Sequence, residues 1–366
     1  MHLRRLWLTD FRSYPTVELE LPSGVTAVVG PNGRGKTNLL EAVAYLATLR
    51  SFRGAPSDAL LRVGAERAVV RGEVHTDGRD HLIEAEIGRT GRNRVLLDKQ
   101  RLARQRDLIE VMRVTVFSPD DLDLVKGGPA RRRGLLDDLL VGVHPRHDVV
   151  RVEFERSLRQ RNALLRQMAG RPDESALVTL DVWDQKLAVA GDTLASLRSD
   201  LVERIAPVVT RAYREVAEEA LEVGMEYLAP WRSTDEQVGT GLAAALSMSR
   251  RDDIRRGTTL VGPHRDELEL TLRGLPARTH ASQGEQRSFT LALRLAAHRV
   301  LSETYGSPPI LLLDDVFSEL DPHRSAALLR SLPEGQTLLS SAAGLPQGIA
   351  PELVLHVDTG SISAAA

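Results

Sequence analysis

Three short segments of this chain carry side chains suited to phosphate chemistry, and the first is a glycine-rich run that ends in Lys36 and Thr37. Glycines let the backbone curl so that successive N–H groups point at phosphate oxygens, and a helix that starts there adds the positive end of its dipole. In such a loop the lysine reaches the β- and γ-phosphates, and the threonine hydroxyl is a ligand of Mg²⁺. The residues predicted to bind a nucleotide are Gly30, Pro31, Asn32, Gly33, Arg34, Gly35, Lys36 and Thr37.

The residues around this loop fit the strand, loop and helix that the motif requires. Residues 25–29 are apolar or β-branched, and apolar side chains recur at helical spacing from Leu39 to Ala47. We therefore expect a strand that ends at the loop and a helix that begins at Lys36.

The second chemically suited segment supplies carboxylates. Residues 310–313 are apolar and lead directly into Asp314 and Asp315. This order is typical of a buried parallel strand whose acid emerges at the carboxyl edge, where open α/β sheets bind ligands. We predict that Asp314 holds Mg²⁺ together with Thr37, and that Asp315 orients the attacking water. The predicted catalytic residues are Lys36, Asp314 and Asp315, with ATP and Mg²⁺ as cofactors.

A third segment, 282–286, precedes an amphipathic helix pattern. Ser282 and Gly284 offer a hydroxyl and free N–H groups at the helix start, which is a second place for an anion; alone, this segment is better explained as a plain helix N-cap. In combination, the three segments are typical of ABC-type ATPase heads. In such heads one ATP lies between the glycine-rich loop of one copy and the Ser-x-Gly helix of another, so the sequence predicts a homodimer that forms on ATP binding.

Composition limits the possible partners and location. The chain has 366 residues, no cysteine and a formal net charge of −2, so there is no general electrostatic attraction to nucleic acid. We found no signal-peptide core and no apolar run long enough for a bilayer, and we expect a soluble, cytoplasmic protein with no membrane partner. DNA contacts would need local patches, although each patch is more simply explained as a solvated face. The candidates are Arg131 to Arg133; Arg250, Arg251, Arg255 and Arg256; and Lys99, Arg101, Arg104 and Arg106.

The pattern along the chain predicts an α/β fold with an inserted helical domain. Alternating apolar and polar residues before about 125 indicate an antiparallel β layer beside the loop strand. Residues 126–255 keep helical spacing, with a break at 170–172, and indicate a helical arm. We predict an ABC-type ATPase head from 1–125 and 256–366, with a mixed sheet and an antiparallel β layer, interrupted by the arm at 126–255.

Further stretches resemble the RecF family of bacterial DNA replication and repair proteins. The resemblance runs in order along nearly the whole chain, from residue 3 to residue 321. It is carried by the stretches 10–14, 36–42, 50–53, 117–122, 124–129, 262–266 and 318–321.

The resemblance implies a function. It implies ATP-dependent dimerisation on DNA at gaps or junctions of single and double strands, and weak, slow ATP hydrolysis that releases the clamp. It also implies cooperation with RecR and RecO in loading RecA during the response to DNA damage. The alternative from another class is the ATPase subunit of a membrane transporter, and a third is an architectural DNA-bridging head in which hydrolysis is incidental.

Several positions stay open at this level. Asp315 stands where transporter ATPases usually carry the longer glutamate, which is a reason to expect slow turnover. The strand that ends in Ser340 and Ser341 lacks the histidine that often senses the γ-phosphate, and a lid glutamine is not found, although 118–121 is the region to search.

Two pairs of side chains also have open roles. Either Arg12 or Tyr14 is a candidate contact to adenine or phosphate. His264 and Arg265 are candidates for catalysis or, equally, for a structural role.

Overall fold

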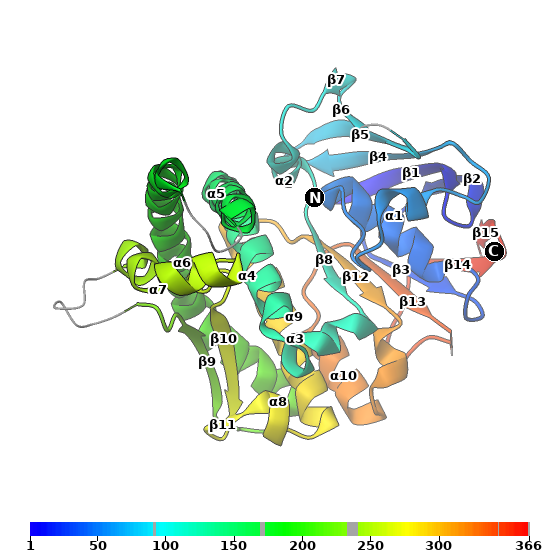
Figure 1. Ribbon diagram of the computed structural model, residues 1–366. Coiled ribbons are helices and arrows are strands. Elements are labelled where there is room, and N and C mark those ends of the chain that lie inside the picture. Colours follow the sequence, from blue (N-terminus) through cyan, green and yellow to red (C-terminus); the bar gives the residue numbers. More distant parts are fainter. Residues whose placement is uncertain (91–92, 169–172, 233–240, 343, 365–366) are drawn as a thin grey trace. The chain divides into compact units, whose positions relative to one another are not determined.

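The computed structural model describes residues 1–90, 93–168, 173–232, 241–342 and 344–364 (Figure 1). The chain forms two compact units, the first made of Met1–Leu122, Arg211–Ala220 and Arg287–Ala366, and the second of Asp123–Thr210 and Leu221–Gln286. Most of the predicted head lies in the first unit and most of the predicted arm in the second, although residues 256–286 also belong to the second unit. The break expected at 170–172 lies outside the described residues.

A mixed sheet in the first unit carries the glycine-rich loop. Its order is β15-β14-β3-β13-β12-β8, and β14, β3, β13, β12 and β8 run parallel. Every residue of β12 and β13 is buried, as expected for apolar strands covered on both faces. The strands are β3 (Val25–Val29), β8 (Val114–Phe117), β12 (Ile310–Asp314), β13 (Thr337–Ser341), β14 (Leu353–Asp358) and β15 (Ser361–Ala364).

Helix α1 (Lys36–Thr48) begins directly after the glycine-rich loop, so the predicted strand and helix are both confirmed. All of its residues from Leu39 to Ala47 are buried. The helix contacts both the mixed sheet and a second, antiparallel sheet, which explains why it is apolar on nearly every side.

The antiparallel sheet has the order β2-β1-β4-β5-β6-β7. Alternate side chains of its long strands are buried, such as Leu6, Leu8, Val70 and Ile83, while charged side chains occupy the other face. The predicted β layer with one wet face is therefore confirmed. The strands are β1 (His2–Phe11), β2 (Tyr14–Glu20), β4 (Arg67–Thr76), β5 (Arg79–Gly88), β6 (Arg94–Leu97) and β7 (Gln100–Arg101).

Short helices complete the first unit. They are η1 (Ser57–Leu60), η2 (Gln105–Asp107), α2 (Leu108–Val111), η3 (Pro119–Leu122), η5 (Val316–Glu319) and α10 (Pro322–Ser331).

The second unit is mainly helical and contains a small sheet of order β11-β10-β9. A buried charge cluster lies in its interior, where Arg161 pairs with Asp184 at 2.5 Å and with Asp253 at 2.8 Å. Because Arg161 and Asp253 are fully buried, their mutual pairing is what makes both charges tolerable. Residues 268–272, which alternate apolar and polar side chains, form most of β10. The elements are α3 (Asp123–Lys126), α4 (Pro129–Val143), η4 (Pro145–His147), α5 (Asp148–Met168), β9 (Val223–Leu228), α7 (Leu242–Arg256), β10 (Glu267–Leu272), β11 (Leu275–Pro276) and α8 (Ala277–His280).

Two further helices have residues in both units: α6 (Glu174–Ala217) and α9 (Gln283–Tyr305). Across the described ranges, no helix combines the length and the apolar character needed to cross a membrane.

Candidate functional site

The glycine-rich loop joins β3 to α1, and two of its glycines have backbone positions that other residues could not take. Gly30 has φ +154, and a Cβ there would lie 2.4 Å from the carbonyl oxygen of Val357 on β14. Gly35 has φ +119, and a Cβ there would lie 2.7 Å from the hydroxyl of Ser13. The loop is therefore packed closely on its neighbours, in the curled form that lets N–H groups converge.

The turn between β1 and β2 packs against this loop and holds it through hydrogen bonds. Tyr14 is fully buried, and its hydroxyl donates a hydrogen bond to the Gly35 carbonyl oxygen at 2.9 Å. Asn38, in the first turn of α1, donates to the Ser13 hydroxyl at 3.0 Å. The suggestion that Tyr14 stacks on adenine is wrong, because its ring has no exposed face.

The ammonium group of Lys36 lies inside the curl of the loop. Its Nζ donates to the carbonyl oxygens of Gly30 at 2.8 Å and Pro31 at 3.1 Å. No carboxylate within the described residues forms an ion pair with it. A bound phosphate would therefore supply a negative charge to balance the positive charge of this buried lysine.

The glycine-rich loop and the Asp314–Asp315 segment meet at the carboxyl edge of the mixed sheet. The Thr37 hydroxyl donates to Asp314 Oδ1 at 2.9 Å, and the Ser340 hydroxyl donates to the same oxygen at 2.8 Å. The Ser340 hydroxyl also accepts a hydrogen bond from the Asp315 N–H at 2.9 Å. Ser340 lies on β13, between β3 and β12, and so connects the two acidic residues to the strand beside the loop.

Sequence reasoning noted the serine at position 340 only as the absence of a switch histidine. Its bridging role depends on β13 lying between two strands that are far apart in the sequence, and no local pattern reveals that order.

The two carboxylates of this site are only partly satisfied. Burial is the main cause that raises the pKa of Asp314, and the charge of Asp315 raises it further, while hydrogen bonds from Ser340 and Thr37 act in the opposite direction. Asp315 has φ +50, in the left-handed region, and its buried Oδ1 has no hydrogen-bond partner among the described residues. A hydroxyl and two poorly compensated carboxylate oxygens are hard ligands, and they fit a magnesium ion with its water.

Arg53 is a further charged side chain near this site that sequence reasoning did not single out. Its positive charge is one of the influences that lower the pKa of Asp314. Ser51 shapes the loop around it, since its hydroxyl accepts from the Arg53 N–H at 3.2 Å and is itself hydrogen-bonded to Glu41 of α1. The only signal in the sequence was the resemblance of the stretch 50–53.

Arg12 belongs to the same network and is engaged in contacts within the chain. It binds the fully buried carboxylate of Glu41 through two nitrogens, at 2.7 and 2.9 Å, and donates to the Ala59 carbonyl oxygen at 2.7 Å. These contacts tie α1 to the loop that follows it, and a contact between Arg12 and adenine or phosphate stays a prediction.

Ser282 precedes α9 in the second unit and forms a capping box with Glu285. Its hydroxyl accepts from the Glu285 N–H at 3.3 Å, and the Glu285 carboxylate accepts from the Ser282 N–H at 2.7 Å. The second of these bonds is the main cause that lowers the pKa of Glu285, and Arg273 pairs with the same carboxylate at 2.7 Å. The structure thus gives Ser282 the plain capping role within one chain, and a shared nucleotide between Ser282, Gly284 and a second copy stays a prediction.

A family model described as the RecF/RecN/SMC N terminal domain matches residues 2–339. The DNA replication and repair protein RecF of Streptomyces avermitilis is 46% identical over 352 residues, which is 94% of each chain. This chain belongs to the RecF family. The RecF of Acidothermus cellulolyticus is 45% identical over 349 residues, again 94% of each chain.

Solved structures agree with the RecF assignment and with the predicted fold class. A structure of the recombination mediator protein RecF with ATP, in the RecFOR pathway, covers 100% of this chain and 98% of that chain, with 27% identity and a TM-score of 0.90. The Smc head domain of Pyrococcus furiosus, at 15% identity and a TM-score of 0.56, shares the fold. The chain therefore has the α/β head fold of RecF and SMC proteins, and these relatives support DNA replication and repair rather than the transporter alternative.

The 262–266 stretch that resembles RecF proteins lies inside the second unit. His264 packs against Phe154 with ring centroids 6.2 Å apart, and burial lowers its pKa to about 4. Asp266 is fully buried and accepts from Tyr227 at 2.5 Å and from Trp231 at 2.7 Å. These contacts are those of a packing core, so the structural interpretation of His264 is the one that the geometry supports.

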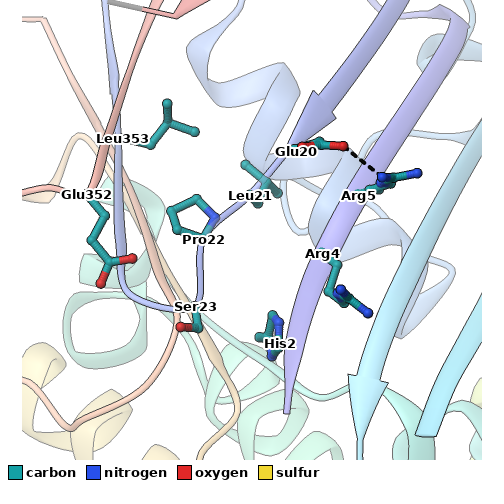
Figure 2. A pocket seen from close by; sticks show the side chains of 9 residues that line it. All are labelled: His2, Arg4, Arg5, Glu20, Leu21, Pro22, Ser23, Glu352 and Leu353. Carbon is teal, nitrogen blue, oxygen red and sulfur yellow. Dashed lines mark ion pairs between the residues drawn. The ribbon is translucent and has the colours of Figure 1, made fainter.

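Residues 118–121 and a pocket beside β1 hold none of the predicted nucleotide-binding residues. The stretch 118–121 of this RecF-family chain contains no glutamine, and Asp121 accepts from the Ser118 N–H at 2.9 Å and pairs with Arg294, so no lid residue is found there. Figure 2 shows a pocket beside β1 where Arg5 and Glu20 pair at 2.8 Å. None of the predicted site residues lines it, so it is separate from the site at Lys36.

Proposed function

We propose that this chain is an ATP-dependent DNA-binding protein of replication and recombinational repair, in which ATP closes two copies on DNA. The observation that carries this proposal is the hydrogen-bonded chain from Thr37 through Asp314 and Ser340 to Asp315, directly beside the glycine-rich loop. It gathers two hydroxyls and two acids where a nucleotide's metal would lie. The ATP named with the related RecF structure supports the same ligand.

Each site residue has a proposed role. The N–H groups of residues 30–37 and the Lys36 ammonium bind the phosphates, while Thr37 and Asp314 hold Mg²⁺, Asp314 through water. The bound ion would neutralise charge that develops between the β- and γ-phosphates. Asp315 orients the attacking water. Its side chain is one methylene shorter than glutamate and comes from a left-handed residue, so the water is held less closely and the ATPase is weak.

The dimer is proposed to form because Ser282 and Gly284 bind the γ-phosphate held by the other copy. Ser282 is exposed at a helix N-terminus, where the dipole and free N–H groups favour an anion. Loss of the γ-phosphate would remove this attraction, so hydrolysis would open the dimer and reset it.

In the cell, we propose, the dimer forms at gaps or junctions between single- and double-stranded DNA in the cytoplasm after DNA damage. RecR and RecO are proposed partners, supported by the RecFOR pathway named for the related structure, and RecA is proposed as the recombinase that they load.

Light scattering of the purified chain with and without ATP and Mg²⁺ tests the dimer. Ser282→Asp keeps an acceptor that caps α9 but places a negative charge against the phosphate, whereas Ser282→Thr keeps the hydroxyl. We expect the wild type and Ser282→Thr to double in mass with ATP, and Ser282→Asp to stay monomeric while it binds ATP with affinity within about threefold of wild type. ATP-dependent dimerisation of Ser282→Asp would refute the shared nucleotide.

A further inference from the structure

The outer face of the antiparallel sheet carries paired charges up to β5 and unpaired positive charges from β6 onward, among the described residues. On the strands from β2 to β5, arginines lie opposite glutamates and form cross-strand ion pairs. These pairs are Arg5–Glu20 at 2.8 Å, Arg71–Glu84 at 3.1 Å and Arg67–Glu86 at 3.4 Å. The positive charge of these three arginines is thus neutralised locally.

The β6–β7 hairpin beyond them carries cations that form no such ion pairs among the described residues; Arg94 lies opposite Glu86, whose carboxylate pairs with Arg67. Arg94, Lys99 and Arg101 are exposed, and none of them has an ion pair or side-chain hydrogen bond among the residues that the structure describes. The acid in its turn, Asp98, is already engaged, because it accepts from His81 at 2.8 Å and from the Leu82 N–H at 2.9 Å.

The cationic surface continues past the hairpin to the end of α1. The Gln105 side chain donates to the Thr48 carbonyl oxygen, which brings the segment after β7 next to Arg50. We call this surface the basic hairpin; its residues are Arg50, Arg94, Lys99, Arg101, Arg104 and Arg106.

In the other two arginine clusters, four of the seven arginines are committed to contacts inside the second unit, while Arg131, Arg251 and Arg256 have no ion pair or side-chain hydrogen bond among the described residues. Arg132 is buried and pairs with Glu267 at 2.8 Å, and Arg133 donates to the Asp266 carbonyl oxygen at 2.7 Å. Arg255 pairs with Asp252 at 2.7 Å, and Arg250 pairs with Asp181. Of the three clusters considered from the sequence, the basic hairpin has the most charge available for a partner.

The side chains of this surface indicate what kind of polyanion it fits. Residues 93–107 contain five cationic and two acidic side chains and no aromatic one. Single-strand binding surfaces usually stack bases on aromatic rings, whereas arginine and lysine alone bind phosphates without reading bases. We propose that the basic hairpin binds the phosphate backbone of duplex DNA, independently of sequence. This inference rests on the proposed function, which supplies DNA as the partner.

Binding titrations by fluorescence anisotropy test it, using a 30-base-pair duplex and a single strand of equal length, with ATP and Mg²⁺ at several salt concentrations. The test variant replaces Arg94, Lys99 and Arg101 with Gln. The matched control replaces Arg5, Arg67 and Arg71 with Gln, which removes the same charge from the same sheet where it is already paired. Thermal melting verifies that both variants fold.

We expect the test variant to lose about 10²-fold in duplex affinity at 0.1 M salt, and its slope of log K against log salt to fall by about 3, because each phosphate contact contributes about 0.9. The control should stay within about threefold of wild type, and both variants should still dimerise with ATP.

The outcomes separate the two proposals. If the test variant keeps wild-type duplex affinity and slope, or if both variants lose affinity equally, the basic hairpin is not the contact, although DNA binding stands. A loss confined to the single strand also overturns the assignment. If the wild type binds neither DNA, the proposed function itself fails.

Discussion

At the scale of single residues, the site contains two neighbouring carboxylates whose negative charge is only partly balanced by hydrogen bonds. Asp314 is buried beside Asp315, and two hydroxyls provide its hydrogen bonds. If this site receives a cation, as we propose, the fold is less stable when the cation is absent, because burial disfavours the ionised carboxylate.

Replacing Asp314 with Asn tests this trade-off. The raised pKa of Asp314 means that its ionised form destabilises the folded chain at neutral pH, and that this cost fades as pH falls through the folded-state pKa. Asp314→Asn keeps the acceptor oxygen without the charge, so at pH 7.5 without nucleotide we expect a melting temperature higher by about 2 °C, which corresponds to roughly 1 kcal/mol.

The same variant should lose the stabilisation that Mg²⁺ and ATP give the wild type. Scanning fluorimetry with and without both ligands measures the two effects. Asp200→Asn, on an exposed carboxylate of α6, is the control and should change neither. A lower melting temperature for Asp314→Asn without ligands would contradict the account.

At the scale of elements, a strand or helix could be predicted where its signal lies within its own residues. The strand at 25–29, the helix from Lys36 and the strand ending at Asp314 were predictable because their signals, an apolar run and a helical spacing, lie within the element itself. The intrachain contacts of Tyr14 and Arg12 were not, because an aromatic or an arginine near a glycine-rich loop has the same local pattern whether it supports the loop or faces a ligand.

Helix α9 carries a buried histidine whose environment gives the fold a pH dependence. His298 packs against β8, with its Nδ1 3.2 Å from the Thr115 hydroxyl, and burial lowers its pKa to about 4. The unfolded chain, with an ordinary histidine pKa near 6.5, therefore binds a proton more readily between these two values. Stability contributed by neutral His298 is complete above about pH 6.5 and is lost as pH falls toward 4.

We expect the urea midpoint of the wild type to fall steadily from pH 6.5 to pH 4.5, with this histidine contributing up to about 2.5 kcal/mol over that range. His298→Gln should flatten the slope, whatever its stability at pH 7, and exposed His356→Gln should leave it unchanged. Circular dichroism at each pH follows the transition. Parallel pH profiles for the wild type and His298→Gln would count against this explanation.

At the scale of the whole molecule, the boundaries between the two compact units are less visible in the sequence than the motifs are. Contacts place residues 256–286 in the second unit, because β10 pairs with β9 and the 262–266 stretch packs among α5 and α6 residues such as Phe154 and Arg198. The alternating pattern after residue 256 led us to predict that these strands belong to the head. The pattern of a single strand does not show which sheet the strand joins. Family resemblance, spread over the whole chain, was the more reliable guide to function.

Hydrolysis as the reset of a DNA clamp predicts a long-lived complex when Asp315 is changed. Asp315→Asn suits the left-handed backbone, which asparagine adopts readily, and keeps the site's shape while it removes the carboxylate that we propose orients water. We expect ATP-dependent dimerisation to persist, hydrolysis to fall by about 10²-fold and the half-life on DNA to rise by at least about tenfold.

Competitor-chase anisotropy measures that half-life, and a non-hydrolysable ATP analogue with the wild type is the matched control, which should give the same long half-life. If neither the variant nor the analogue prolongs the complex, hydrolysis is incidental, and the architectural DNA-bridging interpretation is the better one.

The final strand of the antiparallel sheet is only two residues long, Gln100–Arg101, and is preceded by a lysine in its turn. An open sheet edge invites a neighbouring chain to add a strand, and short cationic edges are a known defence against such polymerisation. The same charges that we assign to DNA thus also guard the molecule against aggregation. Variants neutralised at this edge should accordingly be handled dilute, since they lose protection from edge-to-edge association.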